Sequence, residues 1–321
     1  MSDRPKLFGV MATFRRPDWL AESLDRLARQ TRNLDDLVVV DNGSDEKAAA
    51  LVAEYVGKGL AATYVDPGDN LGPAGAFALG MERLLPKAGP DDWIFLFDDD
   101  DPPFYDDAIE NAERFAVRMV EQDPATGAVG ISGGRFDFRT GRVVRIGDAE
   151  ITGAVPIDHI TGPGLPAYRI AAIRKAGVFR KELFFGFEEL EFGLRLVRSG
   201  FTLYADGDQW ARRKADKRAR GLLPPEEVSV ARHRKKSIKV SDPGWRRYYS
   251  LRNLLLILRE SGHPGTAVRV AVGRGILKPL VNLVISPRLA WANLRLNLTA
   301  IRDHLAGRMG RTVEPGTVWD G

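Results

Sequence analysis

Four consecutive aspartates follow directly after an apolar run, and they are the residues of this sequence best suited to chemistry. The run, Trp93–Phe97, consists of large apolar side chains bounded by polar ones, which indicates a buried strand. A strand that ends in the cluster Asp98–Asp101 gathers like charges, and a divalent cation with oxygen ligands would offset their repulsion. Carboxylates combined with a phosphate favour Mg²⁺ or Mn²⁺. The alternative is a solvated turn in which Asp101 caps the helix expected from about Tyr105.

Polar residues also follow two other expected strands. Thr13 follows the apolar segment 6–12, and Asp41 follows the buried strand expected at 37–40. In its turn, Asp41 either bonds its own backbone or accepts a hydrogen bond from a pyrimidine imide or a ribose hydroxyl. The segment 70–76 places small residues where a helix begins. That pattern indicates either an ordinary helix start or close approach of the backbone to a nucleotide.

Three glutamates open a helix expected at 188–198. Glu188, Glu189 and Glu191 follow the aromatic segment 184–187. Acidic residues in a first turn are favoured by the helix dipole, which alone could explain them. A glutamate beside aromatic rings could also have its pKa raised by burial, as a general base requires.

Strand and helix patterns alternate through the first two hundred residues. The apolar segments 6–12, 37–40, 62–65 and 93–97 are separated by helical patterns. The first of these patterns places Leu20, Leu24 and Leu27 on one face, and two others cover 47–56 and 75–84. This order predicts an α/β fold whose mostly parallel sheet is covered by helices on both faces. Ligands bind beyond the carboxyl ends of the strands in such sheets. Thr13, Asp41 and Asp98 are therefore expected to line one crevice.

Further elements are expected beyond residue 130. We expect a hairpin at 133–147, a short helix at 170–176 and a charge-rich mobile loop at 211–240. Helices are predicted at 245–260, 266–285 and 287–309. The expected division is a nucleotide-binding α/β domain over residues 1–240 and a C-terminal helical region over residues 241–321.

Composition excludes several classes of site. The 321 residues include no cysteine, so disulfides, thiolate zinc sites and a thiol nucleophile are excluded. The apolar segment 7–12 is too short for a signal peptide, and no run of about 18 apolar residues indicates a transmembrane helix. We therefore expect a cytoplasmic protein.

Charge is distributed unevenly along the chain. Residues 209–321 carry 23 Lys and Arg against 8 Asp and Glu, whereas residues 1–208 carry 24 against 35. A basic rear predicts an anionic partner. Arg and Lys between Leu, Val and Trp291 are typical either of solvated helix faces or of helices on an anionic bilayer. Nucleic acid is not expected, because no aromatic residues interleave the basic runs 212–220 and 232–236.

Six segments in this order resemble the inverting glycosyltransferases of family 2, which have the Rossmann-like GT-A fold. The resemblance covers roughly residues 5–255 and is carried by segments 13–17, 38–44, 70–78, 98–103, 188–195 and 248–253. Within the family, segments 70–78 and 248–253 look most like bacterial galactofuranosyltransferases and rhamnosyltransferases. These enzymes build cell-wall or surface polysaccharide.

The resemblance implies a role for each candidate residue. Asp98 and Asp100 would hold Mn²⁺ or Mg²⁺ against the donor diphosphate, with His233 as the candidate for a late histidine ligand. Glu189 would be the general base, where the family usually has Asp, and Glu188 is the second candidate. The nucleotide-sugar pocket would be lined by Thr13, Phe14, Arg15, Asp41, Asn70, Gly72, Asp98 and Asp99. The acceptor would meet Gly162, Gly164 and Glu188.

The predicted function is metal-dependent, inverting transfer of a sugar to a lipid-linked acceptor of the cell wall or surface polysaccharide. Galactofuranose from UDP-galactofuranose is the expected donor, and dTDP-rhamnose is the alternative. The protein would lie peripherally on the inner face of the plasma membrane. A catalytically silent, membrane-bound scaffold that binds nucleotide sugars is the alternative from another class. A sugar-nucleotide pyrophosphorylase is disfavoured, because segment 12–17 contains no glycine.

Overall fold

A computed structural model describes residues 4–223, 244–282 and 286–314 of the chain. The chain divides into two compact units. The first comprises Met1–Arg135, Arg145–Phe184 and Glu188–Asp208. The second comprises Phe136–Val144, Phe185–Phe187 and Gln209–Gly321. The boundary predicted at residue 240 falls among residues outside the described ranges and stays a prediction.

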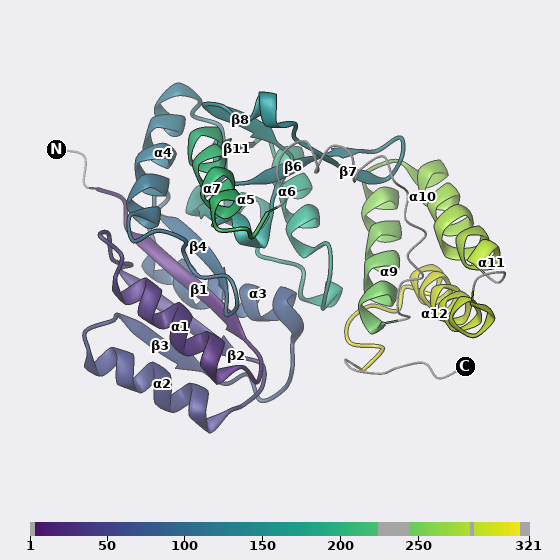
Figure 1. Ribbon diagram of the computed structural model, residues 1–321, viewed down its shortest axis with the longest axis horizontal. Helices are drawn as coiled ribbons and strands as arrows, with labels where there is room; N and C mark the ends of the chain where they lie inside the picture. The colour runs from purple at the N-terminus through teal and green to yellow at the C-terminus, as the bar shows by residue number, and fades with distance from the viewer. Residues whose placement is uncertain (1–3, 224–243, 283–285, 315–321) are drawn as a thin grey trace. The chain divides into compact units, whose positions relative to one another are not determined.

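An eight-stranded sheet forms the core of the first unit, in the order β3-β2-β1-β4-β10-β5-β11-β8 (Figure 1). Its parallel half consists of β1 (Leu7–Thr13), β2 (Asp36–Asp41), β3 (Ala62–Val65) and β4 (Trp93–Asp98). The other half consists of β5 (Thr126–Gly130), β8 (Ala154–Ile157), β10 (Ala167–Arg169) and β11 (Thr202–Asp206). Strand β10 runs antiparallel to both neighbours, and β8 antiparallel to β11. The predicted α/β class with a mostly parallel sheet is confirmed.

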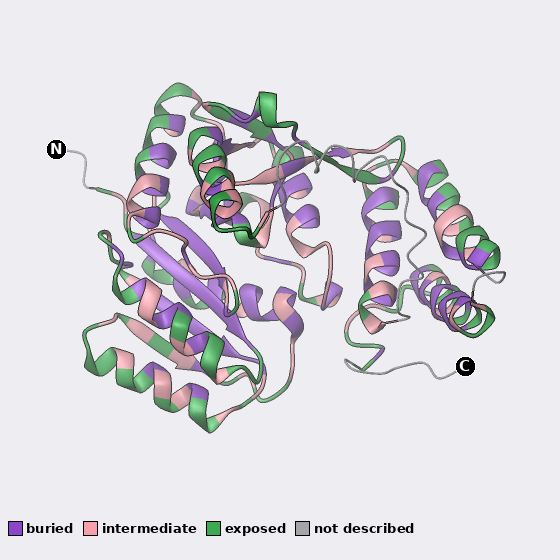
Figure 2. Ribbon diagram, in the orientation of Figure 1, coloured by how far each residue is buried: buried purple, intermediate pink, exposed green. Residues whose placement is uncertain are grey.

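Helices cover this sheet because their apolar side chains lie on one stripe. The helices of this unit are α1 (Pro17–Ala28), α2 (Glu46–Gly57), α3 (Gly72–Leu84), α4 (Ala108–Gln122), α5 (Ile170–Ala176) and α6 (Glu188–Arg198). In α1 the buried stripe is Leu20, Leu24 and Leu27, as the spacing predicted. Figure 2 shows buried central strands and exposed outer faces of α1 and α2. Helix α3 approaches β1 closely at Gly80, where a Cβ atom would lie 2.2 Å from Val10 Cγ1.

Strand register brings the predicted polar residues to one edge of the sheet. All seven residues of β1 are buried, as is usual where helices cover both faces. At its carboxyl end Thr13 pairs with Asp41 of β2, and Ala12 pairs with Asp98 of β4. The ends of three neighbouring strands therefore lie side by side.

A second, three-stranded sheet has the order β7-β6-β9. It contains β6 (Gly133–Asp137), β7 (Arg142–Arg145) and β9 (His159–Ile160). The first two strands form the hairpin that the sequence predicted at 133–147.

The second unit is mainly helical. It contains α9 (Trp245–Glu260), α10 (Pro264–Val270), the π-helix η5 (Ala271–Leu277), α11 (Lys278–Val281) and α12 (Pro287–Leu305). Helix α9 packs against both α10 and α12. Within the described ranges, no helix has the length and apolar character needed to cross a bilayer.

Two predictions for this region were wrong in part. Residues 211–219, expected in a loop, form most of α7 (Gly207–Ala219), because Ala, Arg and Lys are strong helix formers even without an apolar stripe. The single helix expected at 266–285 is instead the series α10, η5 and α11. Two glycines within η5 and Pro279 after it weaken regular α-helical hydrogen bonding. The basic run 232–236 lies outside the described residues.

Candidate active site

Two carboxyl groups from distant parts of the sequence converge on Gly162. A Cβ atom placed on Gly162 would lie 2.9 Å from Asp98 Oδ2 and 3.0 Å from Glu189 Oε1. Asp98 ends β4, and Glu189 lies in the first turn of α6. The absence of a side chain at Gly162 therefore leaves space between a strand end and a helix start.

The environment of Asp98 disfavours its charged form. Burial, followed by the charge of Glu188 and then the neighbouring aspartates, raises the pKa of Asp98 from 3.8 to about 7. The prediction that the cluster at this strand end gathers repelling charges agrees with this shift.

Burial is also the largest influence on Glu189. Together with the charges of Glu188 and Asp98, it raises the pKa of Glu189 well above its ordinary 4.5. The backbone N–H of Gly162 donates a hydrogen bond to this carboxyl group and opposes the shift. The fully buried Tyr168 of β10 is also close enough for the charge of Glu189 to raise its pKa, after burial itself. Sequence reasoning missed Tyr168, which reads as an ordinary aromatic core residue.

Asp99 ties the ends of β1 and β4 together. Its Oδ2 accepts hydrogen bonds from Thr13 Oγ1 at 2.8 Å and from the Phe14 backbone N–H at 3.4 Å. Its carbonyl oxygen accepts one from Ser23 Oγ at 2.7 Å. Burial raises the pKa of Asp99, while the hydrogen bond from Thr13 opposes that shift. The side chains of Thr13 and Asp99 are thus hydrogen-bonded to each other. Contact of either residue with a nucleotide stays a prediction.

Arg16 is a site residue that the sequence reasoning passed over. Its Nη1 lies 2.6 Å from Asp100 Oδ2 and 3.5 Å from Asp99 Oδ1. The available signal was an arginine pair just after the first strand, opposite an expected aspartate cluster. Asp100, predicted as a metal ligand, is therefore ion-paired in this structure.

Asp41 builds its own turn, as the alternative interpretation held. Its Oδ1 accepts from the Gly43 N–H at 2.8 Å, and its Oδ2 accepts from the Asp45 N–H at 2.7 Å and Tyr64 Oη at 2.9 Å. The side chain is fully buried. Recognition of a base or ribose by Asp41 stays a prediction.

The start of α3 is held by two asparagines. Asn42 accepts from the Leu71 N–H at 3.0 Å and donates to the Gly72 carbonyl at 3.2 Å, while Asn70 Oδ1 accepts from the Gly72 N–H at 2.9 Å. Gly72 has φ +66°, and a Cβ atom there would lie 2.1 Å from the Phe184 carbonyl oxygen. Only glycine fits this position. Asn42 was missed because a single asparagine in a turn looks ordinary.

Left-handed backbone occurs repeatedly in the loops that carry the candidate residues. Among described non-glycine residues, positive φ values occur at Arg15, Ser44, Leu165, Phe184 and Phe187. Such conformations cost free energy and tend to cluster at functional sites. Phe14 and Arg15 are exposed, and the Arg15 guanidinium carbon lies 5.2 Å from the centroid of the Phe14 ring.

Gly164, predicted to meet the acceptor, is tightly packed. A Cβ atom there would lie 2.4 Å from the Ser132 carbonyl oxygen, and the Gly164 carbonyl accepts from the Ile131 N–H at 2.5 Å. Gly162, in contrast, faces the two carboxyl groups. Acceptor binding by either glycine, and by Glu188, stays a prediction.

In the second unit, the segment 248–253 holds other parts of the chain in place. Asn253 Nδ2 donates to the carbonyls of Phe185 and Gly186, each at 2.9 Å. Tyr248 Oη donates to Asp303 Oδ2 at 2.8 Å, and Arg252 Nη1 donates to the Gly310 carbonyl at 2.8 Å. The resemblance drew attention to this segment; the structure gives it a packing role.

The donor atoms near Asp98 suit a hard divalent cation, because carboxylate oxygens dominate and their mutual repulsion raises a pKa. Within the described ranges, however, no three Asp, Glu or His side chains are gathered closely enough to hold an ion. His233, the predicted histidine ligand, lies outside the described residues.

Comparisons with known proteins match parts of this chain to glycosyltransferases. Residues 10–152 match the sequence profile of Glycosyl transferase family 2. The chain is 35% identical over 212 residues to "Galactofuranosyltransferase GlfT1" of Mycobacterium tuberculosis (strain CDC 1551 / Oshkosh). It is 32% identical over the same length to the protein of that name from Mycolicibacterium smegmatis. Each match spans 60% of this chain but only 65% of the relative.

Solved structures give the same fold at low sequence identity. A mannosyltransferase of Pyrobaculum calidifontis with GDP-Man and Mn²⁺ has a TM-score of 0.50 and 15% identity, covering 96% of this chain and 89% of that one. Residues 1–349 of TarS from S. aureus with UDP-GlcNAc give 0.50 and 14%, covering 94% and 92%. The predicted GT-A fold is confirmed.

Replacing Asp98 by Asn is expected to stabilise the metal-free protein increasingly as pH rises. The folded-state pKa of Asp98 is raised from 3.8 to about 7, so ionisation opposes folding. This unfavourable contribution is absent below about pH 4, grows up to about pH 7 and is constant above it. Melting temperatures of Asp98→Asn and the unsubstituted protein, measured in chelator from about pH 4 to 8, should diverge accordingly.

Asp66→Asn provides a control of opposite sign. Hydrogen bonds from Gly68 and Ser44 lower the pKa of Asp66, so its carboxylate favours the fold above the unfolded-state pKa. That variant should lose relative stability as pH rises to about 4, and should then differ from the unsubstituted protein by a nearly constant amount up to pH 8. A pH-independent difference for Asp98→Asn would contradict the charge cluster.

Proposed function

We propose that this chain, which carries a glycosyl transferase family 2 domain, transfers a sugar from a nucleotide donor with inversion and with the help of a divalent cation. The observation that carries the proposal is the convergence of Asp98 and Glu189 on Gly162 at the carboxyl edge of the sheet. In open α/β sheets that edge is where ligands bind. One carboxyl group lies at a strand end and the other at a helix start, so each can serve a different reactant.

Glu189 is the proposed general base. Its raised pKa makes it a stronger proton acceptor than an exposed glutamate. The acceptor hydroxyl oxygen attacks the anomeric carbon, its proton passes to Glu189, and the bond to the nucleoside diphosphate breaks in the same displacement. A single in-line displacement inverts the anomeric centre. Glu188 is the second candidate for this role.

Asp98 and Asp100 are the proposed ligands of Mn²⁺ or Mg²⁺, with His233 as a further one. A bound divalent cation would neutralise charge that develops on the leaving diphosphate. The raised pKa of Asp98 supports this role, because a cation beside it would favour the ionised form. Arg16 forms an ion pair with Asp100 in this structure. When a cation binds, Asp100 would either contact both the cation and Arg16 or lose its contact with Arg16.

The proposed nucleotide pocket follows the carboxyl ends of β1, β2 and β4. It comprises Thr13, Phe14, Arg15, Asp41, Asn70, Gly72, Asp98 and Asp99. Phe14 and Arg15 offer exposed groups for stacking and for anion binding. Asp41 and Asn70 give the pocket its backbone shape, since their oxygens already hold turns.

Galactofuranose from UDP-galactofuranose is the proposed donor sugar, supported by the identity to proteins named galactofuranosyltransferase. Rhamnose from dTDP-rhamnose is the alternative. The proposed acceptor is a lipid-linked precursor of cell-wall or surface polysaccharide, and nucleic acid is not a proposed partner.

Peripheral attachment to the inner face of the plasma membrane is part of the proposal. The helices of the second unit expose apolar side chains, including Leu277, Val281 and Trp291. Arginines and lysines lie between them in the sequence. Basic helices with apolar side chains of this kind bind anionic lipid surfaces.

Nucleotide binding can be tested by melting the protein with UDP, dTDP and GDP, each with and without Mn²⁺. A ligand at about 100 times its dissociation constant should stabilise the fold by roughly 2.7 kcal/mol. We expect a metal-dependent shift with UDP. A dTDP-selective shift would move the donor to dTDP-rhamnose. The absence of any shift would contradict the donor site, and binding without transfer to any acceptor would favour the scaffold alternative.

Glu189→Gln should lower the transfer rate by about 10²- to 10⁴-fold, because the amide cannot take the acceptor proton. The UDP-induced shift in melting temperature should persist, since this side chain serves the acceptor. Glu188→Gln is the comparison variant and should lose much less activity than Glu189→Gln, because the proposed base stays in place. If Glu188→Gln is the inactive variant instead, the base assignment moves to Glu188.

Membrane attachment predicts co-sedimentation with phosphatidylglycerol vesicles at low salt, weakening as salt screens the charges. Leu277→Glu should reduce binding, since it places a charge among exposed apolar side chains of the second unit. Val56→Glu, at an exposed position of α2 in the first unit, should not. Equal binding by all three proteins, or none by the unsubstituted protein, argues against attachment through these helices.

A further inference from the structure

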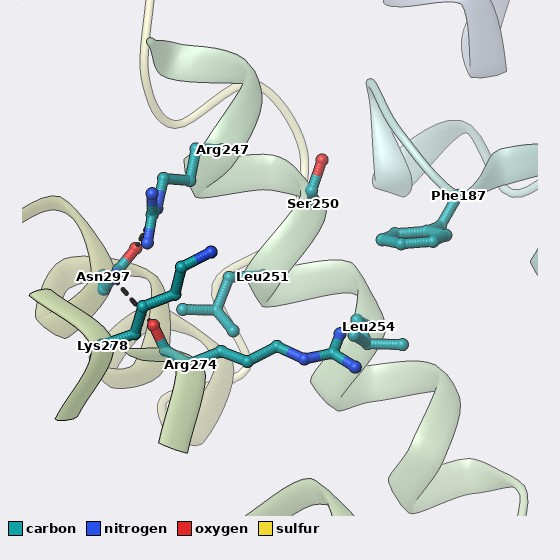
Figure 3. A pocket seen from close by; sticks show the side chains of 8 residues that line it. All are labelled: Phe187, Arg247, Ser250, Leu251, Leu254, Arg274, Lys278 and Asn297. Atoms are coloured by element: carbon teal, nitrogen blue, oxygen red, sulfur yellow. Dashed lines mark hydrogen bonds between the residues drawn. The ribbon is translucent and has the colours of Figure 1, made fainter. Parts of the chain in front are cut away.

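The helical unit contains a cavity of its own. Its volume is about 220 Å³, well above the roughly 10–15 Å³ that one water molecule requires on this measure. Figure 3 shows the side chains that line it: Phe187, Arg247, Ser250, Leu251, Leu254, Arg274, Lys278 and Asn297. All of these residues belong to the second unit.

The charged residues that line this cavity are all cationic. Arg247 comes from α9, Arg274 from η5 and Lys278 from α11, and no acidic residue is among the described residues that line it. In Figure 3 the Arg274 and Lys278 side chains extend from their helix toward α9. Cations gathered in a recess repel each other and lose hydration, so an anion bound between them is strongly favoured.

Hydrogen bonds fix the polar groups of the cavity. Asn297, which is fully buried, accepts from Arg247 Nε at 3.1 Å and donates to the Gly275 carbonyl at 2.8 Å. Arg274 Nη2 donates to the carbonyls of Thr140 and Gly141 at 3.2 and 2.9 Å. The two guanidinium groups are therefore held before any ligand arrives, which lowers the entropy cost of binding.

A rare helix type supplies one of these cations. Arg274 lies in the seven-residue π-helix η5, and Lys278 follows directly after it. π-helical turns are uncommon and are often found at functional sites. Here Asn297 satisfies a carbonyl of the widened turn. Burial, and then the charge of Arg142, lower the pKa of Arg274, and a bound anion would oppose both effects.

The remaining wall is apolar. Leu251, Leu254 and Phe187 line the cavity together with the cations. Lys278 is also flanked in the sequence by Leu277 and Val281, which are 53% and 67% exposed. A ligand that combines a multiply charged anionic group with a hydrocarbon chain matches both features.

We propose that this cavity binds a diphosphate group attached to an apolar chain. Three cations suit the charge of a diphosphate, Asn297 holds Arg247 in place, and the leucines accommodate the first part of the chain. The identification of this ligand as the lipid-linked acceptor rests on the proposed function; the binding of the diphosphate lipid does not.

Farnesyl diphosphate, titrated calorimetrically in buffer with excess chelator, is the probe. The chelator removes the cation on which nucleotide binding at the sheet edge is proposed to depend. Farnesyl diphosphate should bind, farnesol should not, and inorganic pyrophosphate should bind at least about tenfold more weakly because it lacks the chain. UDP should not compete.

Two substitutions within the cavity and one outside it complete the test. Lys278→Glu and Ser250→Asp each introduce negative charge and should weaken farnesyl diphosphate binding by at least about tenfold. Arg295→Glu makes the same change of charge as Lys278→Glu at an exposed position of α12 that does not line the cavity, and should have little effect. Circular dichroism and melting of each variant establish that it folds; the two cavity variants change different helices, so either alone suffices.

Each contrary result has a definite meaning. Equal affinity for inorganic pyrophosphate would identify a free-phosphate site and overturn the lipid ligand. An equal loss with Arg295→Glu would reduce the effect to general surface charge, and competition by UDP would assign the cavity to the donor. If farnesyl diphosphate does not bind while UDP with Mn²⁺ still shifts the melting temperature, the cavity proposal is wrong and the proposed function stands.

Discussion

The confinement of two carboxyl groups beside Gly162 is the constraint on which the candidate site depends. Burial is the largest influence that raises the pKa of each group, the charge of Glu188 raises both, and the charge of Asp98 also raises the pKa of Glu189. Residues Trp93–Phe97 of β4 are apolar and buried in the core. Because Asp98 is the last residue of this strand, their burial fixes its position. The neighbouring Asp99 is then held by Thr13 and Ser23, so the start of the loop after β4 is fixed against α1 and the end of β1.

Much of the fold could be predicted from the sequence, because its signals are local. Apolar runs predicted β1 to β4, and the helical stripe of α1 was read from leucine spacing. The carboxyl edge followed from topology alone. By contrast, Arg16 and Asn42 gain their roles from partners far along the chain, at Asp100 and at Leu71–Gly72, and no pattern within one segment reveals such pairs. The π-helix η5 was missed for a related reason, since Asn297 of α12 completes it.

The segments that resemble a known family also contain residues whose side chains hold the fold in place. Asp41 closes a turn with both of its oxygens, and Asn70 holds the start of α3. Arg195 of α6 is likewise occupied, donating to Glu191 and to the carbonyls of Ala176 and Val178 at the end of α5. A motif residue therefore cannot be assigned to ligand binding by type alone. Gly162 is informative for the opposite reason, because a side chain there would occupy the space between two carboxyl groups.

The chain enters the helical unit three times, at Phe136–Val144, at Phe185–Phe187 and finally from Gln209. The second segment, Phe185–Phe187, accepts two backbone hydrogen bonds from the Asn253 side chain. It immediately precedes Glu188 and Glu189, which begin α6. The two units are therefore not continuous in sequence. Recombination at a single crossover point readily exchanges domains that are continuous in sequence. In this chain it would separate Phe136–Val144 and Phe185–Phe187 from the rest of the helical unit. Any change in what the helical unit binds would therefore have to arise by substitution within that unit rather than by exchange of the whole unit.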